Sequence, residues 1–435
     1  MTENSKNIMG QITIPFEIVK EGERELGNIP SLSEKIKSSF VKDISKTLEI
    51  IMAGGLFVKA SDIHIEPEED GTKIRMRLDG ILHDVITINK DISKRLTSRI
   101  KLLSKVKLNI EDRPQDGRFT IILPFRDDPL EIEIRMSALP SEYGETLVLR
   151  LLDPRKLIVL EDLGLRKDLF EIFKREIEKP NGMVIVTGPT GSGKTTTLYA
   201  FLKTINKPGV KIITIEDPVE YHLGGISQTE VNPERGYDFA NGLRAIVRQD
   251  PDVVLVGEIR DLETAQIGMQ AALTGHLVFS TLHTNDAPGA IARLLAIGEK
   301  MASIGPAINM VIAQRLIRKV CQNCVKFETP APSLIENIRK ELEGVKEDVF
   351  SFPSSVEIPI AVGCKECSFT GYSGRVGIFE AFLLDEEMEE HLYSSPPIAE
   401  TRKKAIEKGM ITVRQDGLIK ILEKKTTIEE IDRVT

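Results

Sequence analysis

The feature that most constrains this chain is a glycine-rich segment that follows a short apolar run. Met183–Val186 reads MVIV, which predicts a buried strand, and Gly188–Thr195 reads GPTGSGKT, which fits the pattern G-x-x-x-x-G-K-[ST]. The glycines let backbone N–H groups face a polyphosphate, and the following helix adds the positive end of its dipole. A glycine-rich turn without a ligand is the alternative. Strand, spacing, Lys194 and Thr195 all favour nucleotide binding instead.

The residues of this loop have different parts in holding a nucleotide. Lys194 is predicted to begin the helix and to reach the β- and γ-phosphates, while the Thr195 hydroxyl coordinates Mg²⁺. The predicted nucleotide-binding residues are Gly188, Pro189, Thr190, Gly191, Ser192, Gly193, Lys194, Thr195 and Thr196.

Composition limits the classes of protein to which the chain can belong. Its 435 residues, 41% hydrophobic and 29% charged, are ordinary for two or three globular domains. No apolar stretch approaches the roughly 20 residues of a membrane span, and the N-terminus MTENSKNIMGQ lacks the build of a signal peptide. The net charge of −8 disfavours a nucleic-acid machine, which usually has a basic surface. We therefore expect a cytoplasmic protein that associates with membranes only through partners.

All four cysteines occur in two C-x-x-C pairs, Cys321 with Cys324 and Cys364 with Cys367. In a reducing compartment such pairs indicate a four-thiolate structural zinc site rather than disulfides. Redox dithiols or knuckles without metal are the alternatives, and the segment 325–363 between the pairs is longer than is usual in zinc ribbons. Because four thiolates leave no open coordination position, the zinc would hold a subdomain together and take no part in a reaction.

The region before the phosphate-binding loop reads as a separate α/β domain. A capping-box pattern and helical spacing of apolar residues predict one amphipathic helix over residues 31–53, ended by Gly54-Gly55. Strict alternation predicts a strand at Thr72–Leu78, which opens a hairpin with a basic outer face. Two more alternating strands, Glu131–Met136 and Leu147–Leu151, flank the loop LPSEYGE.

From Met183 onwards, short β-rich runs alternate with helical stretches, which predicts a mostly parallel sheet. The runs are Met183–Val186, Ile212–Ile215, Val253–Val256 and Leu277–Ser280. The predicted fold class is therefore α/β: an N-terminal α/β domain, a RecA-like P-loop ATPase core, an inserted Cys₄ zinc subdomain and C-terminal helices. The expected boundaries are an N-terminal segment at 1–39, the α/β domain at 40–155, the core at 156–320, the tetracysteine subdomain at 321–367 and the helical region at 368–435.

Polar residues cluster just beyond the predicted strands, where open α/β sheets bind ligands. Ile213–Glu220 ends in three carboxylates, Pro251–Asp261 contains Gly-Glu after an apolar strand, and Thr274–Asn285 has a histidine on each side of a strand. Phosphoryl transfer needs a water-positioning group and metal support at such strand ends, which favours functional roles for Glu220, Glu258 and His283 over solvated turns. By contrast, we interpret His276 as a packed histidine and Arg75 and Arg77 as a solvated sheet face.

Together with Ala60–Pro67 and Arg135–Glu145, these blocks resemble the secretion ATPases of type II secretion and type IV pilus assembly, often called the GspE/PilB family. The resemblance covers about residues 45–385, with the blocks in order. Residues 213–220 match the family's aspartate box, 253–258 its Walker B strand and 275–285 its histidine box. The tetracysteine element is typical of the assembly and secretion members, whereas the retraction motors lack it.

The resemblance implies a role for each matching residue of the core. Glu220 would orient or deprotonate the attacking water, supported by Glu216 and Asp217. Glu258 would hold the Mg²⁺ shell through water, and His283 would sense or stabilise the γ-phosphate.

The resemblance also implies a hexameric ATPase that couples ATP hydrolysis to assembly of a type IV pilus or type II secretion pseudopilus at the inner membrane. Arg135 and Arg150 match arginines that the family presents to nucleotide from the N-terminal domain. The expected partners are five further copies of the chain and an inner-membrane platform protein. The alternative is a RecA-like nucleic-acid translocase, against which count the acidic balance, the absence of tryptophan and the lack of an aromatic-rich basic stripe.

Overall fold

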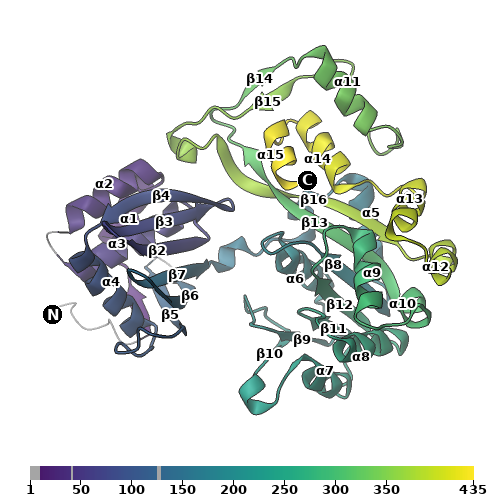
Figure 1. The fold of residues 1–435 in the computed structure, drawn as a ribbon, viewed down its shortest axis with the longest axis horizontal. Coiled ribbons are helices and arrows are strands. Elements are labelled where there is room, and N and C mark those ends of the chain that lie inside the picture. The colour runs from purple at the N-terminus through teal and green to yellow at the C-terminus, as the bar shows by residue number, and fades with distance from the viewer. Residues whose placement is uncertain (1–9, 41–42, 125–128) are drawn as a thin grey trace. The chain divides into compact units, whose positions relative to one another are not determined.

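The computed structural model describes residues 10–40, 43–124 and 129–435, which fold into two compact units, each with its own seven-stranded sheet (Figure 1). Unit 1 comprises Met1–Lys156, Cys321–Val325 and Ala361–Ser373; unit 2 comprises Leu157–Val320, Lys326–Ile360 and Gly374–Thr435. Within the described ranges, no helix is both long enough and apolar enough to cross a membrane. Most of the N-terminal stretch MTENSKNIMGQ lies outside the described residues.

The sheet of unit 1 is antiparallel except at one edge, where β1 pairs parallel to β5. In spatial order its strands are β1 (Gln11–Thr13), β5 (Gln115–Leu123), β6 (Leu130–Ser141), β7 (Gly144–Leu152), β2 (Asp62–Glu68), β3 (Gly71–Leu78) and β4 (Ile81–Ile88). The three strands predicted from alternation are confirmed as parts of β3, β6 and β7. The predicted loop LPSEYGE is wrong, because its ends continue the two strands and only a tight turn remains between Ser141 and Gly144.

Four helices share one apolar core with this sheet: α1 (Phe16–Glu25), α2 (Ile29–Ser39), α3 (Ile44–Phe57) and α4 (Lys90–Leu103). Residues 10–39, which the sequence set apart as an N-terminal segment, thus supply β1, α1 and α2 to the core. The predicted bounds of the five domains stay predictions.

The single helix predicted over residues 31–53 is wrong. The chain forms α2, capped by Asn28, and α3, capped by Asp43, while residues 41–42 of the predicted helix lie outside the described residues. Gly54-Gly55 lies inside α3 and does not end it. A Cβ atom at Gly54 would lie 2.2 Å from Leu32 Cδ1, so the glycine permits the close packing of α2 on α3.

The sheet of unit 2 is parallel from β10 through β13. In spatial order its strands are β10 (Ser227–Glu230), β9 (Ile212–Glu216), β11 (Val253–Val256), β12 (Leu277–Leu282), β8 (Gly182–Thr187), β13 (Ile308–Val320) and β16 (Tyr372–Leu383). The four predicted β-rich runs are therefore confirmed as strands. The last strand, β16, comes from the region predicted to be helical, because its buried run from Val376 to Phe379 is apolar enough to join the sheet.

Helices cover both faces of this sheet, as the continuous burial of its strands requires. Along β8, Met183 and Ile185 face one apolar cluster with α7 (Phe239–Val247), α8 (Leu262–Leu273), α9 (Ala287–Ala296) and α10 (Met301–Ala307). Val184 and Val186 face the other cluster with α5 (Lys167–Ile177) and α6 (Lys194–Ile205). The remaining elements are β14 (Lys326–Glu328), β15 (Ile358–Ile360), α11 (Pro332–Glu341), α12 (Glu386–Tyr393), α13 (Ile398–Glu407), α14 (Val413–Leu422), α15 (Ile428–Val434) and short 3₁₀ turns.

Candidate nucleotide site and cysteine cluster

The phosphate-binding loop connects β8 to α6, and α6 begins at Lys194 as predicted. Gly188, Gly191 and Gly193 have φ angles of 147°, 78° and 91°, a backbone conformation that L side chains rarely adopt. A Cβ atom at Gly188 would also lie only 2.5 Å from the backbone oxygen of Gln314. The glycines are thus required by backbone geometry and by close approach to a neighbouring strand.

Two side chains of the loop fit an oxyanion. The Lys194 ammonium donates to the backbone oxygens of Gly188 at 2.8 Å and Pro189 at 3.2 Å, which folds it over the loop. Burial lowers the pKa of Lys194, and the nearby charge of Glu258 opposes that effect. Within the described part of the chain, the buried Ser192 hydroxyl has no hydrogen-bond partner. An ammonium, an unsatisfied hydroxyl and the start of a helix together suit a nucleotide phosphate.

The sheet register brings the histidine box beside this loop. In the pairing of β12 with β8, Leu282 lies opposite Thr187, so His283 and Gly188 follow at the same edge of the sheet. The backbone N–H of Thr284 donates to Thr187 Oγ1 at 2.8 Å, which fixes the residue after His283 against the start of the loop. The structure therefore brings His283 to the phosphate-binding edge, as parallel strands predict.

Glu258 lies at the same edge, after β11, between two basic side chains. Its Oε2 atom is 3.2 Å from His283 Nε2, and its Oε1 atom accepts a bond from Arg260. Arg260 also lies 3.7 Å from an oxygen of Asp217, which links the ends of β9 and β11. Arg260 was not predicted as a site residue, although its place two residues after Glu258 was a usable signal. The cluster can place a carboxylate and a histidine near a nucleotide held by Lys194.

Glu216 differs from the other carboxylates because it is only 3% exposed. It accepts hydrogen bonds from Tyr199 Oη at 2.5 Å, Thr214 Oγ1 at 2.5 Å and Gln228 Nε2 at 3.3 Å. This burial limits its contact with water, so a supporting role suits it. Glu220 is half-buried, and its backbone N–H donates to Tyr199 Oη at 3.3 Å. Tyr199 was not predicted as a site residue, and its place one helical turn after Thr195 was the available signal.

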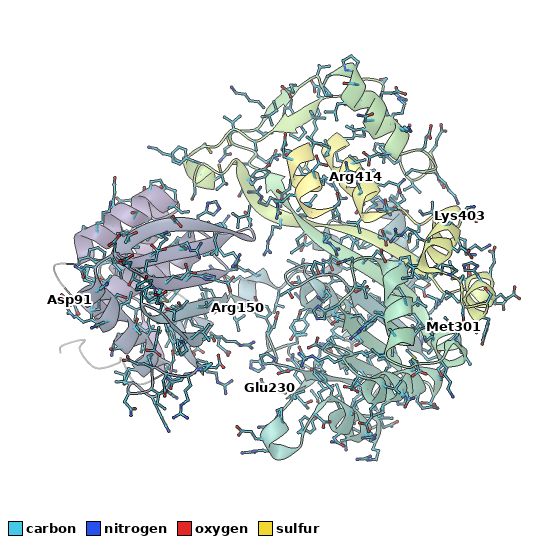
Figure 2. All side chains as sticks on the ribbon, viewed as in Figure 1. Asp91, Arg150, Glu230, Met301, Lys403 and Arg414 are labelled. Atoms are coloured by element: carbon cyan, nitrogen blue, oxygen red, sulfur yellow. The ribbon has the colours of Figure 1, made fainter. Side chains whose placement is uncertain are left out.

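Arg135 and Arg150 lie opposite each other on β6 and β7 of unit 1. Figure 2 shows Arg150 among the side chains of that unit. Arg135 Nε is 3.3 Å from Glu133, and Arg150 Nε donates to Asp62 at 3.0 Å. Arg118 on β5 lies opposite Arg135, so three arginines occupy adjacent strands. Like charges on directly opposite residues repel, which makes this part of the sheet a candidate for binding an anion.

The residues interpreted as structural have defined partners. Arg75 is 2.5 Å from Glu66, and Arg77 is 3.4 Å from Asp62, both on the neighbouring strand, and the two arginine side chains stay 30% and 33% exposed to solvent. His276 lies just before β12, at the edge opposite the phosphate-binding loop, with Nδ1 3.0 Å from the backbone oxygen of Ala271. His276 is therefore a packed residue outside the candidate site.

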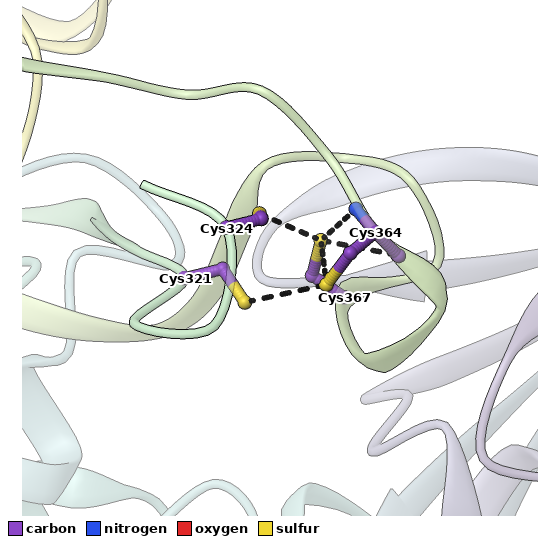
Figure 3. A group of neighbouring side chains, drawn as sticks. All are labelled: Cys321, Cys324, Cys364 and Cys367. Atoms are coloured by element: carbon purple, nitrogen blue, oxygen red, sulfur yellow. Dashed lines mark hydrogen bonds between the residues drawn. The ribbon is translucent and has the colours of Figure 1, made fainter. Parts of the chain in front are cut away.

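The four cysteines converge in unit 1, with their sulfur atoms all within 4.8 Å of one another (Figure 3). Cys321 and Cys364 Sγ are 3.9 Å apart, as are Cys324 and Cys367 Sγ. Tetrahedral zinc with Zn–S distances of about 2.3 Å spaces its sulfurs about 3.8 Å apart, which matches this cluster. All four are free thiols, so the set can hold a metal ion.

Comparisons with known proteins agree along nearly the whole chain. The family described as "Type II/IV secretion system protein" matches residues 35–433. The "Type IV pilus assembly ATPase PilB" of Thermus thermophilus is 40% identical over 416 residues, which cover 95% of this chain but only 44% of that protein. The "Type II secretion system ATPase E" of Vibrio cholerae is 41% identical over 412 residues, covering 94% and 78%.

A solved structure supports the same comparison. The pilus retraction motor PilT with bound ADP has a TM-score of 0.58 and 25% identity, covering 88% of this chain and 96% of PilT.

Proposed function

Because the chain belongs to the family of type II/IV secretion system proteins and is an ATPase of that family, we propose that it is a hexameric motor for filament assembly. Hydrolysis of ATP would drive assembly of a type IV pilus or a type II secretion pseudopilus. The observation that carries this proposal is the family match over residues 35–433, within which the phosphate-binding loop, Glu258 and His283 meet at one sheet edge. The resemblance and the α/β ATPase fold predicted from the sequence are confirmed, and a nucleic-acid translocase is not favoured.

At the candidate site, Lys194 would contact the β- and γ-phosphates and Thr195 would bind Mg²⁺. Glu258 would act on the metal's water shell. His283, whose Nε2 atom lies 3.2 Å from Glu258 Oε2, would respond to the γ-phosphate. Glu220 would orient the attacking water, because Glu216 is buried in its own hydrogen-bond network and Asp217 lies 3.7 Å from the Arg260 guanidinium. Magnesium supplies charge stabilisation to the transferred phosphoryl group when it is bound.

The arginines of unit 1 would complete this chemistry. Arg135 and Arg150 belong to a different unit from the phosphate-binding loop, and the resemblance implies that they act on the phosphates of a bound nucleotide. A guanidinium that meets developing negative charge contributes on the order of 10³–10⁵ in rate. Contacts made and lost during each cycle would turn hydrolysis into motion of rigid bodies.

The cysteine cluster would hold zinc as a structural ion, and the protein would act in the cytoplasm at the inner membrane through a platform protein. The match between the sulfur spacing and tetrahedral zinc supports the structural zinc ion. The pilus and secretion ATPases among the relatives support action at the membrane through a platform protein.

Stimulation of hydrolysis tests the motor function. ATP turnover is measured with the cytoplasmic domain of a platform protein and, separately, with DNA at increasing salt. We expect several-fold stimulation by the platform domain and none by DNA. Stimulation by DNA that weakens steeply with salt would instead establish the nucleic-acid translocase.

Variants test the catalytic assignment. Lys194→Ala should abolish turnover and weaken nucleotide binding, whereas Glu220→Gln should bind ATP and fail to hydrolyse it.

Arg135→Ala and Arg150→Ala should fold and bind nucleotide but lose most turnover. Arg75→Ala is the matched control, because it removes another arginine from the same sheet. If both Arg135→Ala and Arg150→Ala turn over like wild type, the arginines of unit 1 have no catalytic role.

A further inference from the structure

A tyrosine outside the predicted catalytic set joins the helix of the phosphate-binding loop to the segment that carries Glu220. Tyr199 lies on α6, one turn after Thr195, so the two residues share one side of that helix. Its side chain is 1% exposed and packs edge-on against Tyr221, with ring centroids 6.4 Å apart. Its hydroxyl contacts both Glu216 and the backbone of Glu220. One side chain thus connects α6, the end of β9 and the segment beyond it.

The surroundings of this hydroxyl determine the direction of each hydrogen bond. Burial, followed by the negative charge of Glu216, raises the pKa of Tyr199, so the phenol keeps its proton. The proton goes to Glu216 Oε2 at 2.5 Å, and the oxygen accepts the backbone N–H of Glu220 at 3.3 Å. The backbone of Tyr221 also donates to this oxygen. The hydroxyl is therefore anchored on one side by a buried carboxylate and holds two consecutive N–H groups on the other.

The carboxylate that anchors Tyr199 is itself firmly held. Thr214 Oγ1 and Gln228 Nε2 donate to Glu216 Oε1, at 2.5 Å and 3.3 Å. Thr214 is on β9 and Gln228 is on the neighbouring β10. The network therefore fastens α6 to two strands of the sheet through buried and part-buried hydrogen bonds, and Tyr199 links the segment of Glu220 to it.

We propose that Tyr199 is a positioning residue for ATP hydrolysis, which holds Glu220 at a set distance from the phosphates gripped by the start of α6. The inference rests on the proposed role of Glu220 in activating water. A group that activates water must lie within hydrogen-bond reach of it, and small displacements lower the rate strongly. Lys194 and Thr195 grip the nucleotide at one end of α6, and Tyr199 ties the Glu220 segment to the same helix. Tyr199 acts through Glu220 and is not itself a catalytic residue.

The variant Tyr199→Phe tests this inference, because it removes the hydroxyl and keeps the packed ring. We expect kcat to fall roughly tenfold, with the KM for ATP and the affinity for ADP within about twofold of wild type. An unchanged melting profile would show that the fold is intact. A kcat equal to that of wild type would overturn the proposal, and so would a loss of activity that lies entirely in KM.

The matched control is Tyr237→Phe, which likewise removes a tyrosine hydroxyl in unit 2, but one that donates to Thr229 Oγ1 at 3.0 Å rather than to Glu216. It should retain kcat within about twofold of wild type. If Tyr237→Phe lowers kcat as much as Tyr199→Phe, the loss does not come from the bond between Tyr199 and Glu220, and positioning of Glu220 by Tyr199 is refuted.

A double variant separates action through Glu220 from an independent effect. Residual turnover of Glu220→Gln and of Glu220→Gln/Tyr199→Phe is measured as radiolabelled phosphate released in a single turnover. If Tyr199 acts through Glu220, the second substitution should have no further effect. A further tenfold loss would overturn the inference. Normal turnover of Glu220→Gln alone would instead remove the proposed role of Glu220.

Discussion

Replacing single glycines of the phosphate-binding loop by alanine should weaken nucleotide binding by amounts that depend on what surrounds each glycine. At Gly191, φ is 78° and an added Cβ meets nothing within 4 Å, so the cost is the left-handed conformation alone. That conformation costs alanine about 1–2 kcal/mol. Because the empty loop can relax and the nucleotide-bound loop cannot, this free energy is lost on binding, and nucleotide affinity should fall roughly five- to thirtyfold. Gly191→Ala should therefore bind nucleotide weakly but measurably.

At Gly188 the cost should be larger. Its φ of 147° is essentially restricted to glycine, and an added Cβ would lie 2.5 Å from the backbone oxygen of Gln314 and 2.7 Å from Ser192 Oγ. The Gln314 oxygen is backbone of β13, directly after the last residue that pairs with β8, so moving it would shift a strand rather than the end of a flexible side chain. Backbone strain and overpacking together exceed about 3 kcal/mol, which corresponds to more than roughly a hundredfold loss of affinity.

The assay is titration with a fluorescent ADP analogue, together with thermal melting. Gly209→Ala is the control, because Gly209 has a φ of 93°, has open space around its Cβ position and lies in the connection between α6 and β9, outside the loop. It should lose about 1–2 kcal/mol of stability, because its backbone keeps the left-handed conformation, and no affinity for nucleotide. Equal affinities of Gly188→Ala and Gly191→Ala would refute the argument from close packing.

Three further changes test other parts of the molecule. Cys364→Ser should lower the zinc content, measured by metal analysis, from about one ion per chain. It should loosen the cysteine cluster and leave the affinity for ADP unchanged. A wild-type protein that is fully stable without metal would contradict the structural zinc site. Burial, then Asp43, raises the pKa of Glu49 to about 7, above its unfolded value, so stability should fall as pH rises from about 4.5 through 7. Glu49→Gln should remove that fall in stability, so that the variant is about 1 kcal/mol more stable than wild type at pH 8 after allowance for solvent screening. Melting curves with the same pH dependence as those of wild type would refute this prediction. The Lys101 ammonium is 2.8 Å from the buried Glu145 carboxylate, so Lys101→Met should leave a buried charge without a partner. We expect the free energy of unfolding of unit 1, measured with denaturant, to fall by about 3–5 kcal/mol. The double variant Lys101→Met/Glu145→Gln should recover most of that lost stability.

Features that depend on a few neighbouring residues could be predicted from the sequence. The strand MVIV, the glycine loop and the helix beginning at Lys194 follow from local backbone preferences, and the structure has all three. The paired C-x-x-C spacing likewise predicted that the four thiols would converge. The positions of Glu258 and His283 at strand ends were predictable because parallel strands present their carboxyl ends at one edge.

Other features depended on partners that are distant in the sequence. Gly54 reads as a helix breaker, yet Leu32 of another helix packs on it and α3 continues. The run from Val376 to Phe379 becomes a strand only because β13 offers an open sheet edge.

The candidate site shows the same division. The residues of the aspartate box were identified from their spacing, but the burial of Glu216 and its contact with Tyr199 arise from the packing of α6 against β9. Arg260 likewise bridges Glu258 and Asp217 because β9 and β11 are neighbours in the sheet. Local sequence determined which chemical groups this protein has at its strand ends. Only the tertiary structure decided which of them are buried supports and which face the nucleotide loop, because hydrogen bonds and desolvation depend on strand order and register.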